Sequence, residues 1–309
     1  MPPTHNLVYH IKLFFSTLKL PMSIIYAIIK SIKDWVIIMK KIILYLLFII
    51  SLVLLYCFLI APRGFKIVEK DILVSDLAPT FNDFKIVHFS DLLLGSTKNI
   101  EDLDEIVTAI NDLSPNIIVF TGDLISPNYT PNQEDIDVIK KKLSSLNAQL
   151  YKYAVIGDND QMYLDRYEDI LKTSDFRILD NSSTYLFYKD KIPIKISGIS
   201  DINKIDEALN INDNLETTYN IVLTHYPDYI DIISNYDINI VLAGHSLLGQ
   251  IQIPFLGGII KKNNANKYID NYYDINNTKM YVSGGLGSEY INMRFLNKPE
   301  INLYKLKTN

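Results

Sequence analysis

The chain has 309 residues, of which 48% are hydrophobic and 21% are charged, so it can bury a full core and is not an intrinsically disordered protein. Its formal net charge is −5, and no run of Lys or Arg is interleaved with aromatic residues, so no nucleic-acid partner is indicated. Cys57 is the single cysteine, which excludes an internal disulfide and a cysteine-based zinc cluster.

The first predicted element is a membrane-spanning helix over about residues 42–61. The segment reads IILYLLFIISLVLLYCFLIA and carries no charge, and its length is enough to cross a hydrocarbon core as a helix. A cleaved signal peptide has a shorter apolar region that ends in small residues, whereas this one ends in bulky residues followed by Pro62 and Arg63. We therefore expect a retained anchor.

The span divides the chain into three predicted parts: an N-terminal extension (1–38), a membrane anchor (39–65) and a main domain (66–309). The extension is either an amphipathic segment at the membrane surface or sequence upstream of a natural start at Met39; the pattern favours neither. The basic residues that flank the span are Lys30, Lys33, Lys40 and Lys41 before it and Arg63, Lys66 and Lys70 after it. This small excess favours a single-pass protein of the cell membrane whose main domain lies outside the cytoplasm.

Beyond a predicted tether over 62–80, strand patterns alternate with helical patterns, which is typical of an α/β layered domain. The predicted strands are 85–89, 116–121, 151–156, 194–198, 219–223, 238–243, 279–283 and 301–306. The predicted amphipathic helices are 100–113, 134–146 and 161–173, where apolar residues recur at helical spacing.

Carboxylates and imidazoles follow five of these strands directly: Asp91, Asp123, Asp158, His225 and His245. Strand ends of an α/β sheet converge on one crevice, so these side chains can share a site although they are distant in sequence. Oxygen and nitrogen donors suit Mn, Fe, Zn or Mg. An Asp after one strand is usually a turn former or a helix cap, and His88 within a strand is a structural residue on the same reasoning. The five together favour a metal site.

The motifs that hold these residues resemble those of the calcineurin-like metallophosphoesterases, in particular a membrane-anchored bacterial branch. They read FSDLLLGS, TGDLI, VIGDND, LTHYPD, AGHSLLGQ and YVSGGLGS, followed by MRFLNKPEINLYKL, and extend from about residue 85 to 306. The resemblance implies a four-layer α/β/β/α sandwich with two metal ions that activate water for attack on phosphorus.

The resemblance also exposes three departures. It implies that one metal takes Asp91, Asp123 and histidines at positions 93 and 247, where this chain has Leu93 and Leu247. The other implied metal takes Asp123, an Asn at position 158, His225 and His245; here all but the Asn are kept, and Asp158 replaces it. We therefore expect a single divalent ion held by Asp123, Asp158, His225 and His245, with Asp91 a weak contributor.

The third departure is Asn159, which stands where the family has its catalytic histidine. Two interpretations follow. In the first, the chain is a membrane-anchored hydrolase of a phosphate ester or pyrophosphate, on a phosphorylated small molecule or lipid headgroup, that works with one metal. In the second, it is a catalytically silent relative that keeps the fold and one ion as a binding or scaffold protein.

Overall fold

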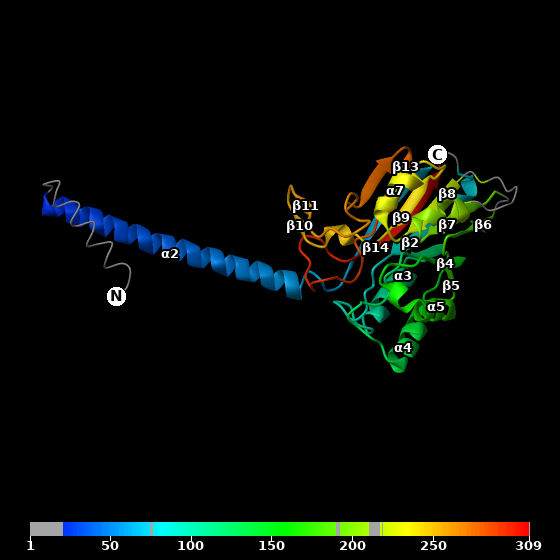
Figure 1. Cartoon of the computed structure of the whole chain (residues 1–309), viewed down its shortest axis with the longest axis horizontal. Helices are drawn as coiled ribbons and strands as arrows, with labels where there is room; N and C mark the ends of the chain where they lie inside the picture. The colour runs from blue at the N-terminus through cyan, green and yellow to red at the C-terminus, as the bar shows by residue number, and fades with distance from the viewer. Residues whose placement is uncertain (1–20, 75–76, 190–191, 210–216, 218, 309) are drawn as a thin grey trace. The chain divides into compact units, whose positions relative to one another are not determined.

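The structure is a computed structural model of the whole chain, and it describes residues 21–74, 77–189, 192–209, 217 and 219–308. It divides into two compact units, residues 1–56 and 57–309. The division lies inside the segment predicted as the anchor (Figure 1).

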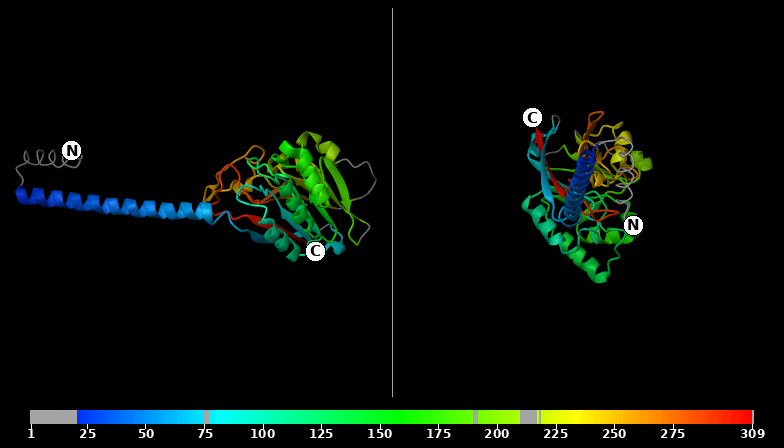
Figure 2. Two further views of the ribbon diagram at one scale, coloured as in Figure 1. Left: turned by 90° about the horizontal axis from the view of Figure 1, so that it is seen from below. Right: turned by 90° about the vertical axis from the view of Figure 1, so that its left-hand side faces the viewer.

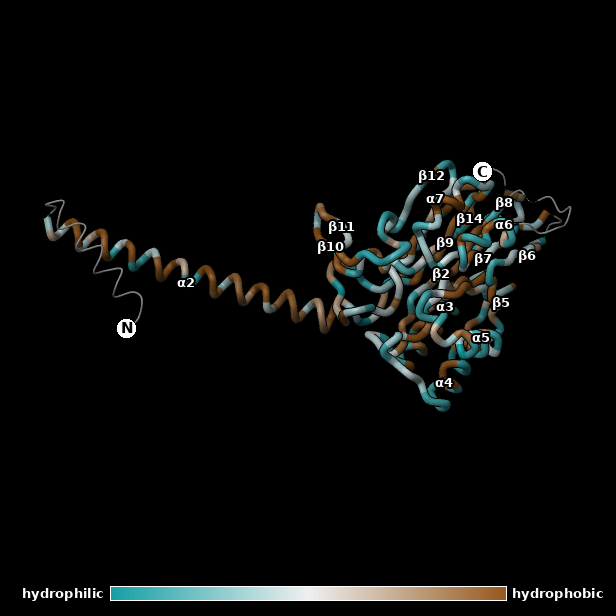
Figure 3. Tube along the Cα trace, in the orientation of Figure 1, coloured by the Kyte–Doolittle hydropathy of each residue, from teal (hydrophilic) through white to brown (hydrophobic). Residues whose placement is uncertain are grey.

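The first unit is dominated by helix α2 (Met22–Leu59), which continues three residues into the second unit. The helix is long and apolar enough to cross a membrane. It begins twenty residues before the predicted span because the preceding segment, although it contains Lys30, Lys33 and Asp34, is rich in residues that favour helices and has no Pro or Gly after Pro21. Figure 3 shows the helix as an almost continuous apolar run in its second half.

The first sheet of the second unit has the strand order β1-β14-β2-β3-β4-β5. Its strands are β1 (Lys66–Val74), β14 (Glu300–Thr308), β2 (Phe84–Phe89), β3 (Ile117–Phe120), β4 (Tyr151–Ala154) and β5 (Phe176–Ile178). Strands β2 to β5 run parallel, and β14 pairs antiparallel with β2. The predicted tether over 62–80 is wrong, because β1 pairs in parallel with β14 along nine residues. As a half-exposed edge strand, β1 lacks the continuous apolar run of the buried strands.

The second sheet has the order β12-β13-β9-β8-β7-β6. Its strands are β6 (Ser182–Leu186), β7 (Ile194–Ile199), β8 (Tyr219–Thr224), β9 (Ile240–Ala243), β12 (Tyr272–Ile275) and β13 (Thr278–Val282). The four central strands β7, β8, β9 and β13 are parallel, and both edge strands are antiparallel to their neighbours. A two-stranded hairpin, β10 (Gln252–Ile253) and β11 (Gly257–Gly258), stands apart from both sheets.

Three apolar cores hold four layers together, which confirms the predicted α/β/β/α sandwich (Figures 1 and 2). One core joins the first sheet to α3 (Leu103–Asp112), α4 (Gln133–Ser144) and α5 (Leu164–Thr173). The second lies between the sheets, and the third joins the second sheet to the short helices α6 (Ile205–Leu209) and α7 (Ile230–Ile233). All eight predicted strands and all three predicted helices are present, with ends shifted by up to three residues.

Candidate metal centre

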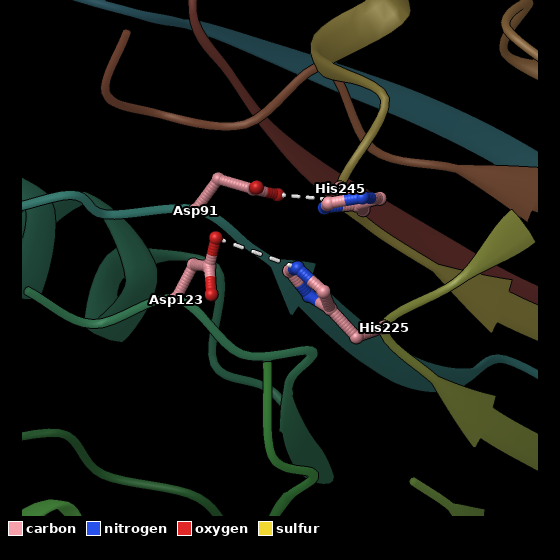
Figure 4. A group of neighbouring side chains, drawn as sticks. All are labelled: Asp91, Asp123, His225 and His245. Atoms are coloured by element: carbon pink, nitrogen blue, oxygen red, sulfur yellow. Dashed lines mark hydrogen bonds and ion pairs between the residues drawn. The ribbon is translucent and has the colours of Figure 1, made fainter. Parts of the chain in front are cut away.

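Four of the predicted ligands come together at the carboxyl ends of four parallel strands (Figure 4). Asp91 follows β2, Asp123 follows β3, His225 follows β8 and His245 follows β9. One ligand atom from each of these side chains lies within 4.8 Å of those of all the others, and all four residues are buried. The first sheet therefore contributes the two carboxylates of the cluster, and the second sheet contributes the two imidazoles.

The backbone at the cluster is held in an unusual conformation. Asp91, Asp123 and His245 have φ values of 49°, 63° and 64°, in the left-handed region that side chains other than Gly rarely adopt. Asp91 N donates to Gly122 O at 2.9 Å, and Leu93 N donates to Asp123 O at 3.0 Å, so the loops after β2 and β3 are tied together. Such conformations persist where the surrounding structure over-determines them, and they concentrate at functional sites.

Each imidazole is oriented by a backbone carbonyl on the side that faces away from the cluster. His225 Nδ1 lies 2.6 Å from Thr121 O, and His245 Nε2 lies 2.9 Å from Asn263 O. A carbonyl only accepts hydrogen bonds, so both of these nitrogens carry hydrogen and donate. The other nitrogen of each ring, Nε2 of His225 and Nδ1 of His245, is the one that can bind a metal ion, which is the arrangement typical of metal-ligating histidines.

Asp158, in the loop after β4, lies against both of these free nitrogens. Its Oδ1 is 3.1 Å from His225 Nε2 and 3.3 Å from His245 Nδ1, while 43% of its side chain is exposed. Burial opposes the charge of Asp158, but the two imidazoles outweigh it and hold the pKa of this carboxyl well below its usual range. Burial likewise opposes the charge of His225, but Asp123 and Asp158 outweigh it and raise the pKa of His225 well above its ordinary value.

The donor set fits a divalent cation. Asp91 Oδ2 accepts from His245 N at 3.0 Å, while Asp91 Oδ1 is buried without a hydrogen-bond partner. His245 Nδ1 is also buried and has no hydrogen bond, although it lies within ion-pair distance of Asp158. Buried polar atoms are nearly always satisfied, so unsatisfied lone pairs that converge with carboxylates are consistent with a metal site.

Leu93 and Leu247 are completely buried beside this cluster. A Cβ placed on Gly285 would lie 2.4 Å from Leu247 Cδ2 and 2.9 Å from Asp91 Cβ, so the Leu247 side chain packs close to Asp91. The φ values of Leu93 and Leu247 are 45° and 49°. Leucine is rare in this conformation, whereas Asn, Asp and His are enriched there, so the backbone suits a polar ligand better than it suits the leucines present.

Asn159 is directed at Asp123. Its Nδ2 donates to Asp123 Oδ2 at 2.6 Å, and its backbone N donates to Asp123 Oδ1 at 3.0 Å. Both oxygens of a candidate metal ligand are therefore oriented by the residue that stands at the family's histidine position.

Asp160 is a buried residue to which sequence reasoning assigned no role. Its carboxylate accepts hydrogen bonds from the backbone N of Asp123, Leu124 and Gly157, at 2.8 to 3.0 Å. Burial and the charge of Asp123 raise the pKa of Asp160 to about 7, against the effect of the three N–H donors. The residue fixes the turn that presents Asp123; the second carboxylate within the GDND motif was the available signal.

Lys262 and Glu289 form a second feature that the sequence did not reveal. The two side chains are almost completely buried and form an ion pair. Burial would lower the pKa of Lys262, but Asp91, Glu289 and Asp123 outweigh it and raise the pKa above its ordinary value, so the group is an ammonium. A lysine in a long loop is ordinarily exposed, and no sequence pattern identifies Lys262 as a buried one.

Comparison of the sequence with known proteins identifies the family of the chain. The sequence model of the family described as Calcineurin-like phosphoesterase matches residues 84–248. The uncharacterized metallophosphoesterase YkuE of Bacillus subtilis strain 168 is 32% identical over 259 residues, which cover 82% of this chain and 89% of that protein.

Two more distant relatives carry informative names. A transmembrane protein with metallophosphoesterase domain from Danio rerio is 25% identical, over 84% of this chain and 62% of the relative. The UDP-2,3-diacylglucosamine pyrophosphatase LpxG of Chlamydia muridarum (strain MoPn / Nigg) is 24% identical, over 78% of this chain and 88% of the relative. The family match over more than half of the chain, together with the identity to YkuE, shows that this chain belongs to the calcineurin-like phosphoesterase family.

Proposed function

We propose that the chain is a membrane-anchored metal-dependent phosphoric ester hydrolase that works with a single divalent ion. The observation that carries this proposal is the buried cluster of Asp91, Asp123, His225 and His245, whose ligand atoms lie within 4.8 Å of one another. The cluster lies where strand ends of an α/β fold present catalytic groups.

Asp123, Asp158, His225 and His245 would hold the ion, with Asp91 as a weaker fifth ligand whose Oδ1 has no hydrogen-bond partner. A divalent ion such as Mn, Fe, Zn or Mg, if bound here, would polarise a phosphoryl oxygen and lower the pKa of a water molecule. Two histidines with their tautomers fixed by Thr121 and Asn263 are suited to bind it without reorientation. The apolar side chains of Leu93 and Leu247 leave Asp91 without the imidazoles that a second ion would need.

The chain's own residues also constrain the chemistry of the substrate. The Lys262 ammonium supplies positive charge near Asp91, where it can attract a phosphoryl oxygen. Asn159 can donate a hydrogen bond but cannot give a proton to the leaving group, and loss of such acid–base help typically costs about 10² to 10⁴ in rate. We therefore expect a preference for leaving groups that depart without protonation, such as a phosphate or a phenolate.

The apolar helix α2 supports a substrate at the membrane. Its length and composition suit a single membrane span, and we keep the proposal that the main domain lies outside the cytoplasm. A phosphorylated lipid headgroup or a pyrophosphate suits both the anchor and the name of the Chlamydia muridarum relative, a pyrophosphatase of a diacylated sugar nucleotide.

The second candidate is a catalytically silent binding or scaffold protein that retains one ion. It is favoured by the complete burial of Leu93 and Leu247 beside the cluster and by the engagement of Asn159 with Asp123. Neither feature requires a reaction at the site.

Hydrolysis by the full chain in detergent separates the two candidates. With added Mn²⁺, we expect release of p-nitrophenol from bis(p-nitrophenyl) phosphate, and we expect Asp123→Asn or His225→Ala to abolish it. Asp169→Asn is the matched control, because the Asp169 side chain is 59% exposed and lies on α5, outside the cluster. Metal binding without hydrolysis of phosphate esters or pyrophosphate would favour the silent protein instead.

A further inference from the structure

An exposed apolar surface lies on two loops of the second unit. We call it the apolar loop surface; its members are Ile253, Phe255, Leu256 and Ile259 in and next to the β10–β11 hairpin, and Tyr290, Ile291 and Leu296 of the loop between β13 and β14. Phe255 is fully exposed, and Leu256, Tyr290 and Leu296 are 79%, 73% and 58% exposed. Figure 3 shows the β10–β11 hairpin as a largely apolar segment that projects from the second unit. Contiguous exposed apolar residues of this kind mark an interaction site.

Hydrogen bonds join the two loops into one structure. Gln252 N donates to Phe295 O at 2.9 Å, and the side chain of Gln250 donates to Ile291 O and Met293 O at 2.8 and 3.0 Å. The hairpin and the later loop therefore present their apolar side chains as one surface.

This surface is continuous with the place where the chain leaves the apolar helix. Cys57, the first residue of the second unit, accepts a hydrogen bond through its carbonyl from Arg294 N at 3.1 Å. Arg294 directly precedes Phe295, to which the hairpin is bonded, and its buried guanidinium donates to the carbonyl oxygens of Gly284, Gly285 and Gly287. Within the second unit, Cys57 is thus bonded to the residue that directly precedes Phe295 in the apolar loop surface segment.

The charged residues within the two loop segments are all Lys or Arg. Residues 246–268 and 290–299 contain no Asp or Glu, while Lys261 and Lys298 in these segments are exposed. Lys298 also approaches the chain exit, because a Cβ on Gly64 would lie 3.9 Å from its Cε and Nζ. Aromatic and aliphatic side chains with flanking lysines are the composition of segments that bind at a lipid interface.

We infer that the apolar loop surface inserts into the interfacial region of the same bilayer that the apolar helix spans, and that the lysines contact lipid phosphates. The hairpin loop begins after His245 and returns to it at Asn263, whose carbonyl binds the His245 ring. Insertion of the loop would therefore hold the metal cluster near the lipid headgroups. The inference concerns the surface alone and stands whether or not the site is catalytic.

Lipid-dependent fluorescence quenching of the full chain tests the inference. Bimane would be attached at Phe255→Cys, and separately at Phe187→Cys, in a Cys57→Ala background reconstituted into phosphatidylcholine and phosphatidylglycerol vesicles. Phe187 is the matched control, because it is 48% exposed and follows β6, at the opposite end of the second unit from β10 and β11 in Figure 1. The native Cys57 is buried. If the Cys57→Ala chain does not fold, Cys57 is retained and labelling of the wild-type chain measures the background signal from it.

We expect lipids with a nitroxide high on the acyl chain to quench the probe at position 255 several-fold more than the probe at position 187. We expect aqueous iodide to quench in the opposite order. Two results would overturn the inference: free access of iodide to position 255 without lipid quenching, or protection from both quenchers, which would indicate that protein covers the hairpin.

Discussion

The Nδ2 atom of Asn159 donates a 2.6 Å hydrogen bond to Oδ2 of Asp123, and the backbone N of Asn159 binds the other oxygen of the same carboxylate. The side chain at the position of the family's catalytic histidine is thus directed at a metal ligand. Asn159 is therefore expected to act on metal affinity more than on a substrate, since partners that orient metal ligands typically contribute about 10- to 100-fold in affinity or activity.

Asn159→Ala is expected to weaken Mn²⁺ binding by about 10-fold, because the Asp123 carboxylate loses its side-chain donor. Titration calorimetry on the metal-stripped full chain measures the change. Asn203→Ala is the matched control, because Asn203 is exposed and lies far from Asn159 in the sequence. An unchanged affinity with a large loss of hydrolysis would instead assign Asn159 to the substrate.

Lys262→Met is expected to change cation and anion binding in opposite directions. The Lys262 ammonium interacts with Asp91 and Asp123 and repels a cation, so its removal should tighten Mn²⁺ binding. The same ammonium attracts an anion, so its removal should weaken inhibition by inorganic phosphate. Lys262→Met combined with Glu289→Gln controls for the unpaired carboxylate that the single change leaves buried. If both affinities move in the same direction, Lys262 affects the site only through packing.

The sequence predicted the parts of this protein that depend on local pattern. The central strands are short apolar runs, so their positions and the exits at Asp91, Asp123, His225 and His245 could be deduced. Strand β1 could not, because Glu69, Lys70 and Asp71 interrupt its apolar residues and its pairing with β14 spans the length of the domain. The pairing of Lys262 with Glu289 is equally non-local.

The site residues were predicted as a set but not in their arrangement. No periodicity shows that Asp158 contacts both imidazoles, that Asn159 binds Asp123, or that Asp160 fixes the turn below it. These contacts depend on left-handed backbone at Asp91, Asp123 and His245, which Asp and His tolerate but which no sequence pattern predicts.

His88 is expected to make the protein sensitive to acid. Burial lowers its pKa to about 3, against about 6.5 in the unfolded chain, so the native ring is neutral. As the pH falls from 6.5 toward 3, the unfolded state binds a proton that the native state does not, and stability falls by about 1.4 kcal/mol per pH unit from this group. Its contribution is fully retained above pH 6.5.

The His88→Asn variant measures this effect. The Asn side chain can still hydrogen-bond to Thr121, the partner of His88, but it does not titrate. Urea unfolding followed by near-UV circular dichroism at pH 6.0 and 5.0 should show a smaller loss of stability for the variant than for the wild type. Equal losses would show that the native His88 takes up the proton.

Leu93→His, Leu247→His and Asn159→His together are expected to recruit a second ion and raise the hydrolysis rate. The strands, Asp91 and the shared Asp123 are already in place, and the left-handed backbone at both leucines tolerates histidine. Neither single Leu→His change should suffice, since a site that lacks one imidazole still binds poorly, so the effects should be non-additive.

The restoration carries a steric risk that the structure makes specific. Leu93 and Leu247 are fully buried, and the chain at Gly285 and Gly287 lies against them, so planar imidazole rings of a different shape must displace packed atoms. Metal content and hydrolysis rate of the single, double and triple variants decide the outcome. A folded triple variant that still holds one ion and gains no activity would show that the pocket itself has been remodelled.

The most direct test of the central claim is the number of divalent ions bound per chain. Elemental analysis of the full-length protein, purified in detergent and equilibrated with Mn²⁺ before removal of free metal, should return one ion. His245→Ala should empty the site, and Asp91→Ala should reduce occupancy less. Two tightly held ions per wild-type chain, or none, would contradict a single-metal site built on Asp123, Asp158, His225 and His245.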